Sequence, residues 1–209
     1  MALPKPNLYI SLVTLFFFGF FGASHGQVTL SGPICVTTGI TYQYDMTGSW
    51  SDTSSFQFCI TGGIIVDSGS NCINGKPVSF VRVSWNDSIT NGHLALNSSV
   101  GNASLDVGIT QALQGGSIDS ASHYQAVDST QVPATVTCSG AAYGNCSPSY
   151  TYQWQQSADM VSWADITSAT SSSLTFTNPV LQIMYYRRKV TENGSGAIAY
   201  SNEAAVVPR

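Results

Sequence analysis

The sequence predicts an all-β chain in which two consecutive β-sandwich modules follow a signal peptide. Only 9% of the residues are charged, whereas 43% are hydrophobic and 11% aromatic, so core material is plentiful and a disordered chain is excluded. After the N-terminal segment, apolar and polar residues repeatedly alternate with the period of two that strands show, and no useful helical periodicity appears. Turn signals separate these short strands, as they do in sandwiches.

The N-terminal segment, residues 1–26, has the three parts of a secretory signal peptide. Lys5 gives it a positive start, the run from Ser11 to Ala23 is almost wholly apolar, and Ser24 and Gly26 occupy the small-residue positions of a cleavage site. The apolar run is shorter than the ~20 residues that a membrane-spanning helix needs. We therefore expect a secreted protein, extracellular or at the cell surface, without a transmembrane segment in its mature chain; an uncleaved anchor is the alternative.

Residues 27–111 are expected to form the first module. Val81, Val83 and Trp85 fall on one face of a predicted strand, so Trp85 is expected to be a core aromatic residue. The Asn91-Gly92 dipeptide that follows predicts a tight turn before the next strand.

Residues 112–209 are expected to form the second module, entered through a Gly-, Ser- and Gln-rich linker. Trp154 alternates in phase with two tyrosines of its strand and is predicted to point into the core. Tyr186 is expected on the strand opposite. Arg188 would then also face inward, and we expect its stem to pack while its guanidinium reaches the edge of the sandwich.

Five cysteines would reach an oxidising compartment after export, where disulfides form. Cys138 and Cys146 flank a Gly-rich turn, and we expect them to pair. Cys35, Cys59 and Cys72 are three candidates for one further bridge. A Cys35–Cys59 bridge would tie two strands of the first module, a Cys59–Cys72 bridge would close a hairpin, and the sequence does not choose between them.

Four stretches of the second module are specific as a set. They are YTYQWQ at residues 150–155, SWADI with AT at 162–170, YYRRKV at 185–190 and AYSN at 199–202. The set resembles the Ig-like repeats of large bacterial surface proteins, which are often exported with type IX sorting signals and some of which carry RHS/YD repeats. The resemblance covers roughly residues 115–207 and implies an immunoglobulin-like sandwich at the cell surface.

The first module is similar, more loosely, to a PKD-like domain. The residues that carry this likeness are Gly32-Pro33, Phe58, Gly62-Gly63-Ile64-Ile65 and the strand at residues 81–85. A PKD-like module followed by a YQWQ-type module resembles the N-terminal region of RHS/YD-repeat-type secreted proteins. The sequence shows no YD repeats and no sorting domain, so the resemblance implies a surface role rather than a toxin function.

No motif predicts catalysis, a cofactor or a metal site. Thiolate metal sites need Cys or His ligands at short spacings such as C-x2-C, and a serine hydrolase needs an elbow such as G-x-S-x-G; neither is present. The carboxylates are scattered, mostly in turns, and no EF-hand-like calcium loop occurs. The formal charge of −4 and the lack of a basic run argue against nucleic-acid binding.

Three aromatic residues near turns, Trp163, Tyr143 and Trp50, are candidates for ligand contact, with packing at a sandwich end as the alternative. We therefore expect a non-enzymatic secreted or surface protein that acts as a spacer, an adhesive segment or a protein-interaction segment. A carbohydrate-binding surface protein that uses exposed aromatic residues is the alternative, and a secreted hydrolase ranks last. The sequence does not name the partner, and surface proteins and glycans are the classes considered.

Overall fold

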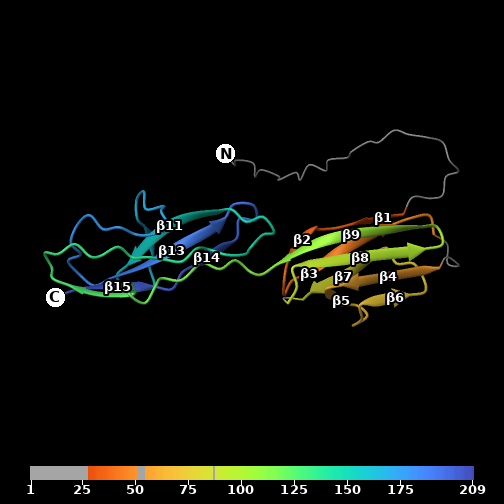
Figure 1. Cartoon of the computed structure of the whole chain (residues 1–209), viewed down its shortest axis with the longest axis horizontal. Coiled ribbons are helices and arrows are strands. Elements are labelled where there is room, and N and C mark those ends of the chain that lie inside the picture. Colours follow the sequence, from red (N-terminus) through yellow and green to blue (C-terminus); the bar gives the residue numbers. More distant parts are fainter. Residues whose placement is uncertain (1–27, 51–54, 87) are drawn as a thin grey trace, which may run out of the picture.

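The computed structural model of the chain describes residues 28–50, 55–86 and 88–209, and Figure 1 shows their arrangement. This part of the chain is all-β, as predicted, and none of its elements is a helix that could cross a membrane. Two β modules lie end to end along the long axis (Figure 1). The predicted signal peptide, residues 1–26, lies outside the described residues.

The first module is a sandwich of two sheets. The four-stranded sheet has the order β1-β3-β7-β5, formed by β1 (Thr29–Ser31), β3 (Thr41–Thr47), β7 (Phe80–Trp85) and β5 (Gly63–Ile65). The five-stranded sheet has the order β2-β9-β8-β4-β6, formed by β2 (Cys35–Thr37), β9 (Gly101–Thr110), β8 (Asn91–Ser98), β4 (Phe56–Thr61) and β6 (Cys72–Asn74). Alternate residues of both sheets point into one shared core, as the strand period requires.

Trp85 lies in this core, only 3% exposed, with its ring edge-on to Tyr44 at 5.9 Å between centroids. The turn predicted at Asn91-Gly92 is wrong, because both residues belong to strand β8. Gly92 is needed there for a packing reason instead. A Cβ atom at Gly92 would overlap the Trp85 ring, so the glycine makes room for the tryptophan.

The second module has one regular sheet. Its order is β10-β15-β13-β11-β12, with β14 paired to β13 beside this path, and the strands are β10 (Tyr124–Val127), β15 (Ala204–Pro208), β13 (Met184–Glu192), β11 (Tyr150–Ser157), β12 (Ala164–Asp165) and β14 (Ile198–Tyr200). Trp154 of β11 and Tyr186 of β13 lie on its inner face, 0% and 3% exposed. They form the centre of the second core.

The layer opposite this sheet is irregular. Instead of strands it contains isolated bridges, between Ile118 and Cys138 and between Val136 and Leu174. These four side chains are buried against Trp154 and Tyr186. With so few backbone ladder bonds, the irregular layer needs other contacts to hold it on the sheet.

Arg188 supplies such contacts. Its side chain is fully buried on the inner face of β13, so the expectation that the guanidinium reaches the edge is wrong. Nη1 donates to the carbonyl of Ser172 at 2.9 Å, and Nη2 donates to the carbonyls of Gly115 and Ser139. These carbonyls belong to the irregular layer, and the guanidinium also lies over the Tyr152 ring. One buried cation, held by carbonyl dipoles and a ring face, thus ties the two layers together.

We predict that Arg188→Met destabilises the chain by about 3 kcal/mol or more, because three backbone carbonyls, that of the buried Gly115 among them, lose their donor. Urea unfolding, followed by far-UV circular dichroism, measures the change in midpoint. Arg187→Met, on the outer face of the same strand, is the matched control, with an expected cost of about 1 kcal/mol. Equal midpoints for the two variants would contradict this role of Arg188.

Candidate functional site

A disulfide joins the two modules. Cys35, the first residue of β2, is bonded to Cys146 in a loop of the second module, across a sequence separation of 111. Gly108 of β9 lies against this bridge, and a Cβ atom there would come within 2.8 Å of the Cys146 sulfur. The glycine therefore lets the two modules approach closely enough for the bond to form.

The predicted bridge between Cys138 and Cys146 is wrong. Cys138 is a free cysteine whose side chain is buried in the second core, opposite Ile118. Burial raises the pKa of its thiol. Cys146 lies in a loop that faces the first module. The two sulfurs are therefore in different parts of the structure, although they are near in sequence.

The second bridge is the hairpin-closing alternative, Cys59–Cys72. Cys59 of β4 and Cys72 of β6 are directly paired across neighbouring antiparallel strands, with a Cα–Cα distance of 4.1 Å. The other alternative, Cys35–Cys59, does not form, because Cys35 is bonded to the second module. This second bridge lies wholly inside the first module.

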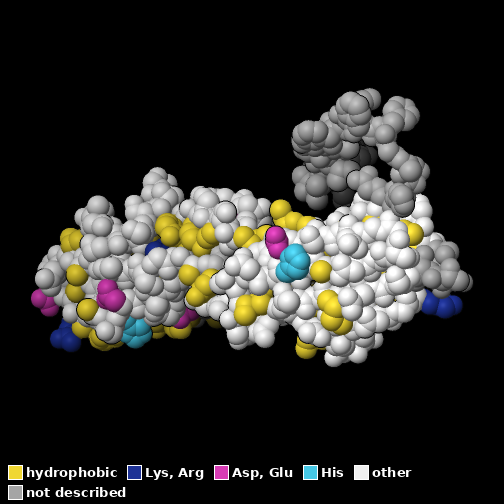
Figure 2. All heavy atoms as spheres, turned by 45° about the vertical axis from the view of Figure 1, so that its right-hand side comes forward, with side chains coloured by type: hydrophobic (Ala, Val, Ile, Leu, Met, Phe, Trp, Pro, Cys, Tyr) yellow, Lys and Arg dark blue, Asp and Glu magenta, His cyan; other side chains and the backbone are white. Residues whose placement is uncertain are grey.

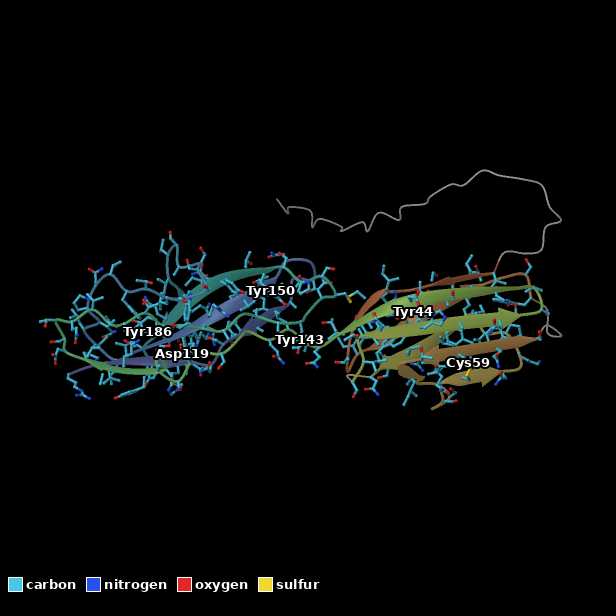
Figure 3. The ribbon with its side chains drawn as sticks, viewed as in Figure 1. Tyr44, Cys59, Asp119, Tyr143, Tyr150 and Tyr186 are labelled. Carbon is cyan, nitrogen blue, oxygen red and sulfur yellow. A yellow bond between two sulfur atoms is a disulfide. The ribbon has the colours of Figure 1, made fainter. Side chains whose placement is uncertain are left out.

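The segment predicted as a linker is hydrogen-bonded into the second module. Gln114 and Ala142 exchange backbone hydrogen bonds of 2.9 and 3.1 Å, and the Gly144 N–H donates to the carbonyl of Gln111 at 3.0 Å. The same loop carries Tyr143, which Figure 3 shows between the two modules. We call the Cys35–Cys146 bridge and these backbone contacts the joint. The disulfide joins the two modules, and the backbone pairing fixes the start of the linker to the second module.

Glu192 organises the loops of the second module that reach the joint. Its side chain has no exposed surface. Its carboxylate accepts hydrogen bonds from the hydroxyl and the N–H of Ser195, from the N–H of Ser149 and from the side-chain amide of Asn145. Asn145 in turn accepts a bond from the Cys146 N–H at 2.7 Å. The donors, first those of Ser195, lower the pKa of Glu192 to about 2.

Two hollows lie near the joint. One of about 110 Å³ is lined by residues of both modules, including Ile109 and Tyr143. A larger open groove of about 600 Å³ is lined by Thr38, Gly39, Gly62, Gly63, Ile64, Ser84, Trp85 and Asn86. Neither lining contains a carboxylate, a lysine, an arginine, a histidine or a cysteine, and the one side chain that could exchange a proton there is the Tyr143 hydroxyl beside the smaller hollow.

The described residues contain no group of three or more His, Cys, Asp or Glu that could hold a metal ion. His93 and Asp106 do form a pair, with 2.6 Å between Nδ1 and the carboxylate, but both side chains are exposed on neighbouring strands β8 and β9. His123 is exposed elsewhere, in the second module. The arrangement gives no cleft in which such a pair could act on a bound substrate.

The three candidate ligand aromatics lie in three different places. Trp50 is half-buried and packs edge-on against Phe56 at 5.9 Å, as part of the first core. Tyr143 is exposed at the joint, with its backbone at φ 65° and its carbonyl bonded to the Tyr150 hydroxyl at 2.8 Å. Trp163 lies on the outer face of the second module. The structure therefore does not assemble them into one site.

Trp163 takes part in a stack with two residues that sequence reasoning missed. The guanidinium of Arg187 contacts the rings of both Trp163 and Tyr200, with its carbon 4.1 and 4.0 Å from their centroids. Arg187 is half-buried on β13, and its Nε donates to the side-chain oxygen of Gln155 at 2.9 Å. We call Trp163, Arg187 and Tyr200 the arginine clamp. The strand alternation could have placed Arg187 on the outer face, but only the pairing of β14 with β13 brings Tyr200 beside it.

The loop that carries Trp163 is rigidly built. The Asp159 carboxylate accepts bonds from the N–H groups of Ser162 and Val161 and from the Ser157 hydroxyl, at 2.8 to 2.9 Å. These donors, Ser162 first, lower the pKa of Asp159 to about 2. The Trp163 indole N–H donates to the carbonyl of Met160 at 3.1 Å. The ring is thus held in place before any ligand arrives.

Residues 115–207 match a family described as "Domain of unknown function (DUF8696)", which covers less than half of the chain. No curated protein matches. Similar solved structures include the C-terminal 282-residue fragment of intimin, in complex with the intimin-binding domain of the translocated intimin receptor: 10% identity, TM-score 0.47, covering 87% of this chain and 63% of that one. Sidekick-1 immunoglobulin domains 1–5 match at 12% identity and TM-score 0.36, covering 87% and 38%. This chain thus spans less than two thirds of either structure.

We predict that Glu192→Gln flattens the acid limb of stability. A carboxyl group whose pKa is about 2 when folded, against an ordinary 4.5, stabilises the fold above about pH 4.5 and loses that contribution as pH falls toward 2. Unfolding free energies measured by urea between pH 7 and pH 2 should therefore fall less steeply in the variant below pH 4.5.

Glu203→Gln is the control, because the Glu203 carboxylate accepts no comparable set of hydrogen bonds within the described residues. It removes one carboxylate of the same module without touching the loops that Glu192 holds, so its effect on the acid limb is the baseline against which Glu192→Gln is compared. Parallel curves for wild type and Glu192→Gln throughout this pH range would show that Glu192 does not hold these loops in its charged form.

Proposed function

We propose that this chain is a non-enzymatic adhesive or protein-interaction segment, secreted or held at a cell surface, whose two immunoglobulin-like modules form one stiff unit. The observation that carries the proposal is the joint. A disulfide between modules and a hydrogen-bonded linker are costly to a protein that needs hinge motion, and they suit one that presents a surface at a fixed distance and angle.

The disulfides also support a place outside the cytosol. Two bridges, one within the first module and one between modules, persist only in an oxidising environment. The predicted signal peptide at residues 1–26 is consistent with this location. The resemblance to the N-terminal region of RHS/YD-repeat-type surface proteins belongs to the same proposal, in which the chain holds other parts of a surface assembly away from the cell.

Binding through a face suits the geometry better than catalysis. The hollows at the joint have uncharged linings, and the two carboxylates whose pKa values are lowered to about 2, Glu192 and Asp159, are each occupied by hydrogen bonds that build loops. A catalytic acid or base needs a free proton-transfer position beside a substrate. Stacking on neutral sugars is also less well supported, because Trp163 and Tyr200 each have one ring face occupied by Arg187.

Backbone ¹⁵N relaxation of the oxidised mature chain tests the stiff joint. We expect both modules to fit one common anisotropic rotational diffusion tensor, since an elongated rigid body reorients as a whole. In Cys35→Ser/Cys146→Ser, the two modules should instead require separate tensors, because the bond that fixes them is gone.

The matched control is Cys59→Ser/Cys72→Ser, which removes a bridge inside the first module. It should lower the stability of that module while the common tensor is retained. Independent tumbling of the two modules in the oxidised wild type would overturn the proposal of a stiff unit.

A further inference from the structure

The arginine clamp has unused binding capacity. The Arg187 Nε–H donates a hydrogen bond to Gln155, but the two terminal nitrogens of Arg187 make no hydrogen bond and no ion pair among the described residues. Arg82 is different, since it is paired with Asp67, and Arg188 is buried and fully engaged with carbonyls except at Nε. A half-buried guanidinium with its outer donors free is an arrangement that recognises a carboxylate.

The clamp restrains the guanidinium. Two rings, each with its centroid about 4 Å from the guanidinium carbon, limit its rotation, and the bond from Nε to Gln155 sets its direction. Gln155 is itself held, because its amide donates to Asp165 at 2.8 Å. The Arg187 side chain therefore loses little conformational entropy when a ligand binds, and this preorganisation favours binding.

The surroundings of the clamp favour an acidic protein partner. Lys189 lies on the same outer face of β13, paired in register with Tyr200, and adds a second positive charge. The one acid joined to this network, Asp165, forms no ion pair with Arg187. Exposed apolar side chains flank the clamp on the same loops and strands, namely Met160, Val161 and Ile198. Figure 2 shows hydrophobic side chains gathered beside a basic one on the second module.

Tryptophan, tyrosine and arginine, rimmed by apolar residues, are the side chains that dominate binding energy in protein interfaces. We propose that the arginine clamp is a carboxylate-binding site that captures an acidic side chain of a partner protein. Arg187 binds the carboxylate through its two terminal nitrogens, and Trp163 and Tyr200 hold the guanidinium and contact the adjoining apolar atoms. The site deepens the proposed interaction function and rests on it.

A simple acidic peptide tests the site without the natural partner. The probe is an acetylated and amidated hexapeptide of alternating glutamate and glycine, titrated into the ¹⁵N-labelled mature chain with its glutamine counterpart as the neutral probe. We expect saturable shifts of the Trp163 indole N–H and the Arg187 Nε–H with the glutamate peptide alone. The chain has a formal charge of −4, so general attraction does not favour such binding.

Variants then separate the clamp from mere charge. Arg187→Gln should weaken binding at least fivefold, and Arg187→Lys should also weaken it, because a lysine keeps the charge but lacks the fork. Lys189→Gln changes the net charge equally on the same face and should weaken binding less than twofold. A cooperative urea transition, with a pretransition baseline that extends beyond the titration conditions, shows that each variant is folded.

Three results would overturn the site: no saturable binding of the glutamate peptide to the wild type, equal binding by Arg187→Gln, or equal losses in Arg187→Gln and Lys189→Gln. Each of these leaves the stiff two-module unit untouched, because that unit is measured by the relaxation of the unliganded chain. Independent tumbling of the modules would conversely reject the stiff unit while the peptide titration still reports on the clamp.

Discussion

The covalent bond between Cys35 and Cys146 is the constraint on which the arrangement of this molecule depends. It closes a loop of 111 residues, and in the chain-entropy description a bridge of that span stabilises the fold by about 4–5 kcal/mol. Its larger consequence is geometric. It links two modules that lie end to end (Figure 1), and the backbone pairing of Gln114 with Ala142 holds the linker on the second module. In the proposed stiff unit, a surface on the second module is presented at a fixed position relative to the first.

In the second module, hydrogen bonds to buried charged side chains hold the irregular layer and the loops in place, a role that strand pairing has in the first module. The second module has one proper sheet, and its other layer is held by the Arg188 guanidinium through three carbonyls. Glu192, at the end of the same strand β13, is an anion that accepts hydrogen bonds. Its carboxylate accepts them from N–H and hydroxyl groups of two loops and so supports the loop that carries Cys146. Among the described residues the two charges form no ion pair with each other; local dipoles satisfy the Glu192 carboxylate and engage both terminal nitrogens of Arg188. Irregular backbone thus becomes rigid enough to hold both the joint and the arginine clamp.

The sequence predicted the features that follow from the period of two in strands, namely the strands themselves and their buried faces. Alternation identified the strands around Trp85, Trp154 and Tyr186, because burial on one face follows from the period of two. It misplaced the Asn91-Gly92 turn, since a glycine that makes room for the Trp85 ring looks the same in sequence as a glycine in a turn. The sequence also predicted a Cys138–Cys146 bridge, because the two cysteines flank one turn. That prediction failed because nearness along the chain does not show which side of a strand a cysteine occupies or which module a loop contacts. The sequence predicted only part of the arginine clamp. Trp163 was a candidate for ligand contact, but Tyr200 joins it only through strand pairing.

The Cys35–Cys146 joint is tested most directly by the disulfide map of the secreted, unreduced chain. Proteolysis under non-reducing conditions, with alkylation of free thiols after unfolding, followed by mass spectrometry, assigns each sulfur. We expect one peptide pair linked through Cys35 and Cys146, one through Cys59 and Cys72, and an alkylated Cys138. A linked pair containing Cys138 and Cys146, with Cys35 free, would contradict the joint and with it the stiff two-module unit.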